Sequence, residues 1–179
     1  MKSVKLYVNV IPIIIILLLI GGAGYFLFGQ DLEIPIEDRK TQITRLEGFP
    51  RMLYVSEDRK KVRKVIKSEE ELNEFLNDVD KNGELTIDTN VNFNRHYLMG
   101  AATKTLEGEN HTFKIKKIYK DTDDKTLTVV QERTDPDEGC KLEGGQNIWV
   151  DIVQINKTDW NIGFELVKKI LPCEDTSEE

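Results

Sequence analysis

The apolar residues divide the chain into one continuous N-terminal run and a longer part in which apolar and polar positions alternate. Residues 6–28 contain no Asp, Glu, Lys, Arg or His and include an unbroken Ile/Leu block at 13–20. A helix of this length rises roughly 34 Å at 1.5 Å per residue, which exceeds the bilayer hydrocarbon core of about 30 Å. We therefore predict a transmembrane helix over residues 6–28.

The charges that flank this run predict its orientation. Lys2 and Lys5 precede it, and the first charged residues after it are acidic. Because positive flanks stay in the cytoplasm, residues 1–5 should be a cytoplasmic stub and the remainder should lie outside a single-pass cell membrane. A cleaved signal peptide is the alternative, since Gly22-Ala23-Gly24 offers small residues for cleavage. We favour an uncleaved signal-anchor because the run exceeds the usual signal core of about 7–15 residues.

The rest of the chain predicts a linker, one domain and a tail. Gly and Pro punctuate residues 29–50 without any helical or strand period, so we expect a linker there. The folded domain is expected over residues 51–173. Residues 174–179 are polar and mostly acidic, which is typical of a frayed tail.

One helix is predicted after residue 67. Ser68 and Glu71 form a capping-box pattern, in which each side chain can bond the backbone at the helix start. An apolar stripe at helical spacing follows, made of Leu72, Phe75, Leu76 and Val79. Asn82 and Gly83 predict the end of this element.

Elsewhere the apolar period is close to two, which predicts strands. They are expected near 52–55, 62–66, 97–99, 113–118, 127–129, 148–152 and 162–166. Ile118 arrives one position late after Phe113 and Ile115, which predicts a β-bulge at Lys116-Lys117. The expected fold is a β-rich α+β domain with a single short helix and about five to seven mainly antiparallel strands.

Charge excludes one class of function. The 179-residue chain has a net charge of −7, and its first 30 residues hold two lysines and no acid. Residues 31–179 therefore hold 23 basic and 32 acidic side chains, a net charge of −9. We expect no nucleic-acid partner, because such binding is driven by an excess of positive charge.

Cys140 and Cys173 are the only cysteines. Two thiols in an oxidising compartment predict a disulfide, and two free thiols are the alternative.

A calcium loop is suggested at residues 78–84. Asp78, Asp80, Asn82 and Glu84 fall within the first half of an EF-hand pattern, with Gly83 at its glycine position. The bidentate Glu that should close the loop is replaced by Thr89. We therefore expect an acidic turn with no metal and no cofactor, and retain a calcium-dependent module as an alternative.

Two further features are expected at the surface. The basic run at 59–64 should be a solvated strand edge protected by lysines, and contact with an anionic lipid or acidic partner is the alternative. Asn110 and Asn156 begin glycosylation sequons that matter only in a host with that machinery.

The order of these features resembles the C-terminal domain of the PrcB protease-complex subunit family over about residues 62–170. The similar segments are 65–68 before the helix, 91–93, Leu98, Gly100, 134–140, and the strand at 148–155 with Asn156-Lys157. The resemblance implies an anchored, extracytoplasmic β-rich domain with one helix. It also implies an accessory role beside a secreted chymotrypsin-like protease and no catalytic residues. The chain departs from the family at 108–113, where relatives have a Thr-Gly-Gly-Tyr-like turn.

The expected function is non-catalytic. The chain contains no Gly-x-Ser-x-Gly, phosphate-loop or dinucleotide-binding pattern. We predict a membrane-anchored binding or accessory module for an extracytoplasmic protein, which could be a protease complex. The predicted contact is the loop at 138–146, made adaptable by Gly139, Gly144 and Gly145 and tethered by Cys140. A hydrolase built on scattered carboxylates is the third alternative, after the calcium-dependent module.

Overall fold

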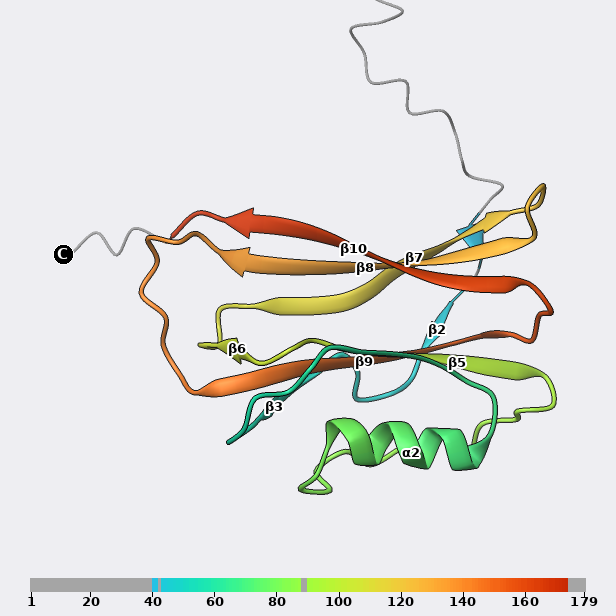
Figure 1. Cartoon of the computed structure of the whole chain (residues 1–179), viewed down its shortest axis with the longest axis horizontal. Helices are drawn as coiled ribbons and strands as arrows, with labels where there is room; N and C mark the ends of the chain where they lie inside the picture. The colour runs from blue at the N-terminus through green and yellow to red at the C-terminus, as the bar shows by residue number, and fades with distance from the viewer. Residues whose placement is uncertain (1–39, 42, 88–89, 174–179) are drawn as a thin grey trace, which may run out of the picture. The chain divides into compact units, whose positions relative to one another are not determined.

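The computed structural model describes residues 40–41, 43–87 and 90–173 (Figure 1). Within these ranges, no helix combines the length and the apolar character needed to cross a membrane. The predicted stub at 1–5, the predicted membrane helix at 6–28 and the acidic tail at 174–179 all lie outside the described residues.

Two β-sheets and one helix make up the described part of the chain (Figure 1). The four-stranded sheet has the order β1-β7-β8-β10, and the six-stranded sheet is built around β9. The strands are β1 (Lys40–Thr41), β2 (Thr44–Arg45), β3 (Arg51–Tyr54), β4 (Val62–Ile66), β5 (His96–Ala102), β6 (Leu106–Glu107), β7 (Thr112–Asp121), β8 (Thr126–Pro136), β9 (Gln146–Asn156) and β10 (Asn161–Leu171). The helix is α2 (Glu69–Val79).

The expected β-rich α+β fold with one short helix is confirmed, whereas the expected number of strands is too low. The described residues form ten strands, and every strand pair among them is antiparallel except the β8–β10 pair. The extra strands β1, β2 and β6 have two residues each, too few to show an alternating pattern. They form because long strands beside them offer unpaired backbone groups.

The parallel pair follows from the path of the chain. After β8 the chain crosses to the six-stranded sheet, forms β9, and returns through residues 157–160 to form β10 beside β8 (Figure 1). Two crossings restore the original direction, so β10 runs parallel to β8 from Asn161 opposite Thr126 to Leu171 opposite Pro136.

The domain begins earlier than residue 51. Lys40–Thr41 pairs with β7, and Thr44–Arg45 pairs with β9. Leu46, in the predicted linker, is buried in the core. The predicted linker boundary at residue 50 therefore lies too far along the chain, because residues 40–41 and 44–45 pair within the sheets and Leu46 is buried in the core. Residues 29–39 of that linker lie outside the described ranges.

The six-stranded sheet is covered on both faces, which gives three layers (Figure 1). Along β9, Ile148, Val150 and Ile152 belong to the cluster that includes the helix residues Leu72, Phe75 and Val79. The side chains of the opposite phase, Trp149, Val153 and Ile155, belong to a second cluster or pack against it, and this cluster is shared with the four-stranded sheet. This alternation is the period of two expected for a strand that separates two cores.

The helix approaches the sheet closely at one glycine. A Cβ atom added to Gly100 on β5 would lie 2.8 Å from the Phe75 ring and 3.0 Å from Ile66. Phe75 is fully buried. Any side chain at position 100 would therefore push the helix away from the sheet.

The predicted helix start is confirmed. The Oγ atom of Ser68 accepts the N–H of Glu71 at 3.2 Å. The Glu71 carboxylate accepts the N–H of Lys67 at 2.7 Å, one residue before the cap. Bonds to Ser68 and to the helix backbone lower the pKa of Glu70, which outweighs the opposing effect of burial. The predicted bulge is also confirmed, because the β7–β8 register shifts between Ile115 and Lys117.

Candidate interaction surface

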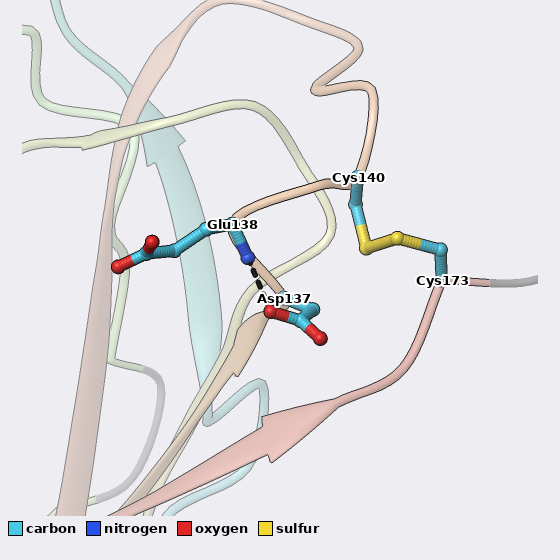
Figure 2. Close-up of a disulfide and its surroundings, with 4 residues drawn as sticks. All are labelled: Asp137, Glu138, Cys140 and Cys173. Carbon is cyan, nitrogen blue, oxygen red and sulfur yellow. Dashed lines mark hydrogen bonds between the residues drawn. A yellow bond between two sulfur atoms is a disulfide. The ribbon is translucent and has the colours of Figure 1, made fainter.

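The loop between β8 and β9 closes one end of the two sheets and carries the predicted contact residues (Figure 1). The predicted disulfide is confirmed: Cys140 in this loop is bonded to Cys173, with Cα atoms 5.2 Å apart (Figure 2). Asp137 donates its N–H to the Leu171 carbonyl at 2.9 Å. The bridge thus joins the ends of the parallel strands β8 and β10, just beyond the last ladder pair.

The loop is held more firmly than its glycine content predicts. Gly144 has a φ of +93°, and a Cβ atom there would lie 2.6 Å from Glu109. The carbonyl of Gly145 accepts the N–H of Gly108 at 3.3 Å and the Asn147 amide at 3.2 Å. Among the three loop glycines, Gly139 has open space around it. Gly144 packs closely against Glu109, and Gly145 is held by the hydrogen bonds of its carbonyl.

A shallow groove of about 490 Å3 lies beside this loop. Its lining comes from the segment before β4, from the β5–β6 region, and from β8 and β9. The lining residues are Asp58, Lys104, Thr105, Leu106, Glu107, His111, Arg133, Asp135, Leu142 and Gln146. Leu142 is 44% exposed, whereas Leu106, the other large apolar residue of the lining, is buried.

Three side chains form a hydrogen-bonded chain in the groove wall. His111 Nδ1 lies 2.9 Å from Asp135 Oδ1, and its Nε2 lies 3.1 Å from the Glu107 carbonyl. Arg133 donates through Nε and Nη2 to Asp135 Oδ2 at 3.0 and 2.5 Å. Burial on its own raises the pKa of Asp135, but hydrogen bonds from Arg133 and then His111 outweigh it and hold the pKa below its usual value.

Both ring nitrogens of His111 lie within hydrogen-bond distance of an oxygen atom, and the tautomer decides which of them donates. The Oγ atom of Thr105 accepts the N–H of Arg59 at 2.7 Å. The groove thus presents fixed charged and polar groups beside the exposed Leu142.

A tyrosine extends the same surface from β3. Tyr54 is 51% exposed and its hydroxyl donates to Glu109. That hydrogen bond, with a smaller contribution from burial, raises the pKa of Tyr54. Tyr54 also lies 3.8 Å from the position of a Cβ atom at Gly145. We call Tyr54, Leu142 and the groove residues the loop surface.

The sequence identified the loop but not the groove beside it. Cys140 and the glycines marked residues 138–146, whereas His111 and Asp135 are brought together only by the pairing of distant strands, and Tyr54 reaches the loop through its hydrogen bond to Glu109. Arg133 and Asp135 are two positions apart in a strand, which indicates that their side chains share one face of β8.

The calcium alternative meets an unfavourable geometry. The Asp80 carboxylate accepts the N–H groups of Asn82, Gly83 and Leu85 at 3.2, 2.9 and 2.5 Å. Asn82 donates its side-chain amide to Glu84 at 3.2 Å. Asp78 is exposed on the helix. In the described ranges, no group of three or more His, Cys, Asp or Glu side chains has the arrangement of a metal site. Residues 88–89, which include the Thr89 position, are not described.

The basic run lies at the edge of the six-stranded sheet, as expected for protective lysines. β4 is the edge strand of the order β2-β9-β5-β4. Arg63 packs over the Phe113 ring at 5.5 Å and donates to the Ala102 carbonyl at 2.6 Å. Burial, and secondarily the charge of Arg133, lowers the pKa of Arg63 to about 10. Both sequon asparagines, Asn110 and Asn156, are exposed.

Fold and surface together define a disulfide-linked β/β/α domain with a preformed loop surface at one end. No protein-family model, curated protein or solved structure matches this chain. The resemblance to the PrcB family therefore stays a prediction.

Proposed function

We propose that this protein is a membrane-anchored, extracytoplasmic binding module that acts by contact, without catalysis, as an accessory to another extracytoplasmic protein. The observation that carries the proposal is the loop surface, where exposed Leu142 and Tyr54 flank a groove of fixed polar groups. Exposed tyrosine and apolar side chains next to fixed polar groups are features that protein–protein contacts use.

The rigidity of the loop supports binding. The Cys140–Cys173 bridge and the close packing of Gly144 fix the loop before any partner arrives. A surface that is already ordered loses less conformational entropy on binding. The disulfide also supports an oxidising compartment, in agreement with an extracytoplasmic domain.

The anchor predicted at 6–28 would place this surface near other membrane-bound proteins and raise its effective concentration toward them. The PrcB-like order of segments favours a protease complex as the partner. No step of proteolysis is assigned to this chain, because no pattern in its sequence supplies a nucleophile, a base and an orienting group together.

The test is a comparison of two matched variants in native membranes. Leu142→Glu places a charge at the apolar anchor, and Lys141→Glu places the same charge one residue away, where the side chain is 87% exposed. After cross-linking and quantitative mass spectrometry, a partner retained by wild type and Lys141→Glu should fall at least fivefold with Leu142→Glu.

Equal recovery with all three proteins would show that the loop surface is not the contact. Substrate turnover by the purified protein in a broad hydrolase screen, abolished by a single carboxylate substitution, would replace the contact role with an enzymatic one.

A further inference from the structure

The strand β10 presents an open edge. In the described part of the chain β10 pairs with β8 alone, and its ladder runs without a register shift from Asn161 to Leu171. The backbone N–H and C=O groups that point away from β8 therefore form a regular template for another strand. Both ends of the strand are fixed, by the 157–160 connection and by the disulfide at Cys173.

The exposed side chains of β10 include large apolar ones, whereas the edge strand β4 and the run before it are mainly basic. Four of the six large apolar side chains exposed in the described ranges belong to β10: Leu166 at 36%, Val167 at 39%, Ile170 at 70% and Leu171 at 51%. The edge strand β4 instead carries Arg63 and Lys64, and the run 59–61 precedes it. Charged edges oppose pairing with another chain. The β10 edge carries charges of both signs, Glu165, Lys168 and Lys169, among its exposed apolar side chains.

We infer that two copies of this chain pair antiparallel through their β10 edges, about a two-fold axis that passes between the two Val167 residues. Opposite residues of an antiparallel pair share a face, so such an axis must relate two identical residues. With Val167 opposite Val167, Glu165 of each copy lies opposite Lys169 of the other. Phe164 then lies opposite the exposed Ile170 on the inner face.

Neighbouring registers pair the same side chains less well. An axis at Leu166 would put Phe164 opposite Lys168 and Glu165 opposite Val167. An axis at Lys168 would set two lysines directly against each other, which is unfavourable. Among these three registers, only the Val167 axis places opposite charges against each other. The Val167 axis also sets Leu166 opposite Lys168, and the Leu166 axis pairs Ile162 with Ile170, so the charges select the register.

The charges are available for this contact. Within the described ranges Glu165 makes no salt bridge, and its side chain is exposed. Lys169 Nζ lies 2.9 Å from Glu132 Oε2 in its own chain. A lysine ammonium carries three donors, so it can bond Glu132 and a second carboxylate together.

A charge-exchange experiment on the full-length protein tests this register. Sedimentation velocity in a mild detergent should give wild type the mass of two chains. Glu165→Lys and Lys169→Glu each create two like-charge pairs, and each should raise the dissociation constant about tenfold. An equimolar mixture of these two variants restores two opposite-charge pairs, and should recover the wild-type dissociation constant.

Lys60→Glu is the matched control, because Lys60 is exposed and precedes β4 in the other sheet. It should dimerise like wild type. Val167→Cys gives a second measurement, in which a dimer linked through position 167 should appear on non-reducing electrophoresis of cells. A single-chain mass for wild type, a dimer unaffected by Glu165→Lys, or a mixture that does not recover affinity would overturn the inference.

Discussion

The buried carboxylate of Asp151 on β9 is held by the guanidinium of Arg45 on β2, with Nε 3.0 Å from Oδ1 and Nη2 3.1 Å from Oδ2. Asp151 also accepts the N–H of Ile115 on β7 at 2.6 Å, and Arg45 donates to the Ile115 carbonyl at 2.6 Å. Ile115 lies at the bulge, where the β7–β8 ladder is interrupted. One ion pair therefore joins both sheets and satisfies backbone groups that the bulge releases.

Loss of this ion pair should destabilise the domain strongly. Arg45→Ala leaves a fully buried carboxylate without its cation, which typically costs about 3–5 kcal/mol when both partners are buried. Arg45 is 32% exposed, so water can partly replace it and we expect about 2–3 kcal/mol. Urea denaturation measures the change in the free energy of unfolding. The control is Arg51→Ala at an exposed position of β3, which should change stability by no more than about 0.5 kcal/mol. Equal stability of the two variants would contradict the role of Asp151.

Reduction of the disulfide should destabilise the domain without changing its fold. The bridge spans 33 positions in sequence, and a loop of that length corresponds to about 3.5–4 kcal/mol in the chain-entropy model. Denaturation with and without reductant measures this difference. A double Cys140→Ser, Cys173→Ser variant should match the reduced protein and show no further response to reductant. Unchanged stability on reduction would mean that the bridge adds no constraint.

An ion-pair cluster around Glu132 on the four-stranded sheet should make the stability of the domain depend on pH. The Glu132 carboxylate accepts hydrogen bonds from Lys116 at 2.5 Å and from Lys169 at 2.9 Å. These bonds, of which that from Lys116 has the larger effect, lower the pKa of Glu132 from 4.5 to about 2. A carboxyl group whose pKa is lower in the folded protein than in the unfolded chain stabilises the fold at any pH above its unfolded pKa. This stabilisation is lost as the pH falls from about 4.5 towards 2. The lysines are half exposed, so we expect about 1 kcal/mol at pH 7. The free energy of unfolding of wild type should exceed that of Glu132→Gln by this amount at pH 7 and by almost nothing at pH 2. A difference that stays constant between these pH values would refute the prediction.

The sequence predicted elements that carry their own periodic signal. The Leu72–Val79 stripe and its Ser68 cap predicted α2, and alternation at 148–152 predicted the central strand. The late position of Ile118 predicted the bulge, because one added residue in a strand moves the next apolar side chain back to the buried face.

Features that depend on strand order were not predictable in this way. β1 and β2 have two residues each, so their membership in the domain is set by their partners on β7 and β9. The parallel pairing of β8 and β10 results from two crossings between sheets, which periodicity does not encode. The groove similarly depends on strand pairing that brings His111 to Asp135, 24 residues apart.

Two glycines of the contact loop should respond differently to the same substitution. Gly144→Ala forces a left-handed φ of +93° on a residue with a Cβ atom and brings that atom within 2.6 Å of Glu109. We expect a loss of about 1–3 kcal/mol. Gly139 has no atom within 4 Å of an added Cβ, so Gly139→Ala should be neutral or slightly stabilising. Thermal unfolding of the pair measures the contrast, and equal effects would mean that the loop is free at both positions.

Asp80 should stabilise the end of α2 in a calcium-independent way. Its two carboxylate oxygens accept three backbone N–H groups that follow the helix, and its own N–H donates to the Leu76 carbonyl at 2.8 Å. A carboxylate that accepts N–H donors has fewer lone pairs left for a cation, which needs six to eight oxygen ligands. Asp80→Ala should therefore cost about 1–2 kcal/mol, equally in calcium and in chelator.

Asp78→Ala removes the neighbouring exposed acid of the same pattern and should change stability little in either condition. A rise in the wild-type melting temperature with micromolar calcium, lost in both variants, would instead establish the calcium-dependent module.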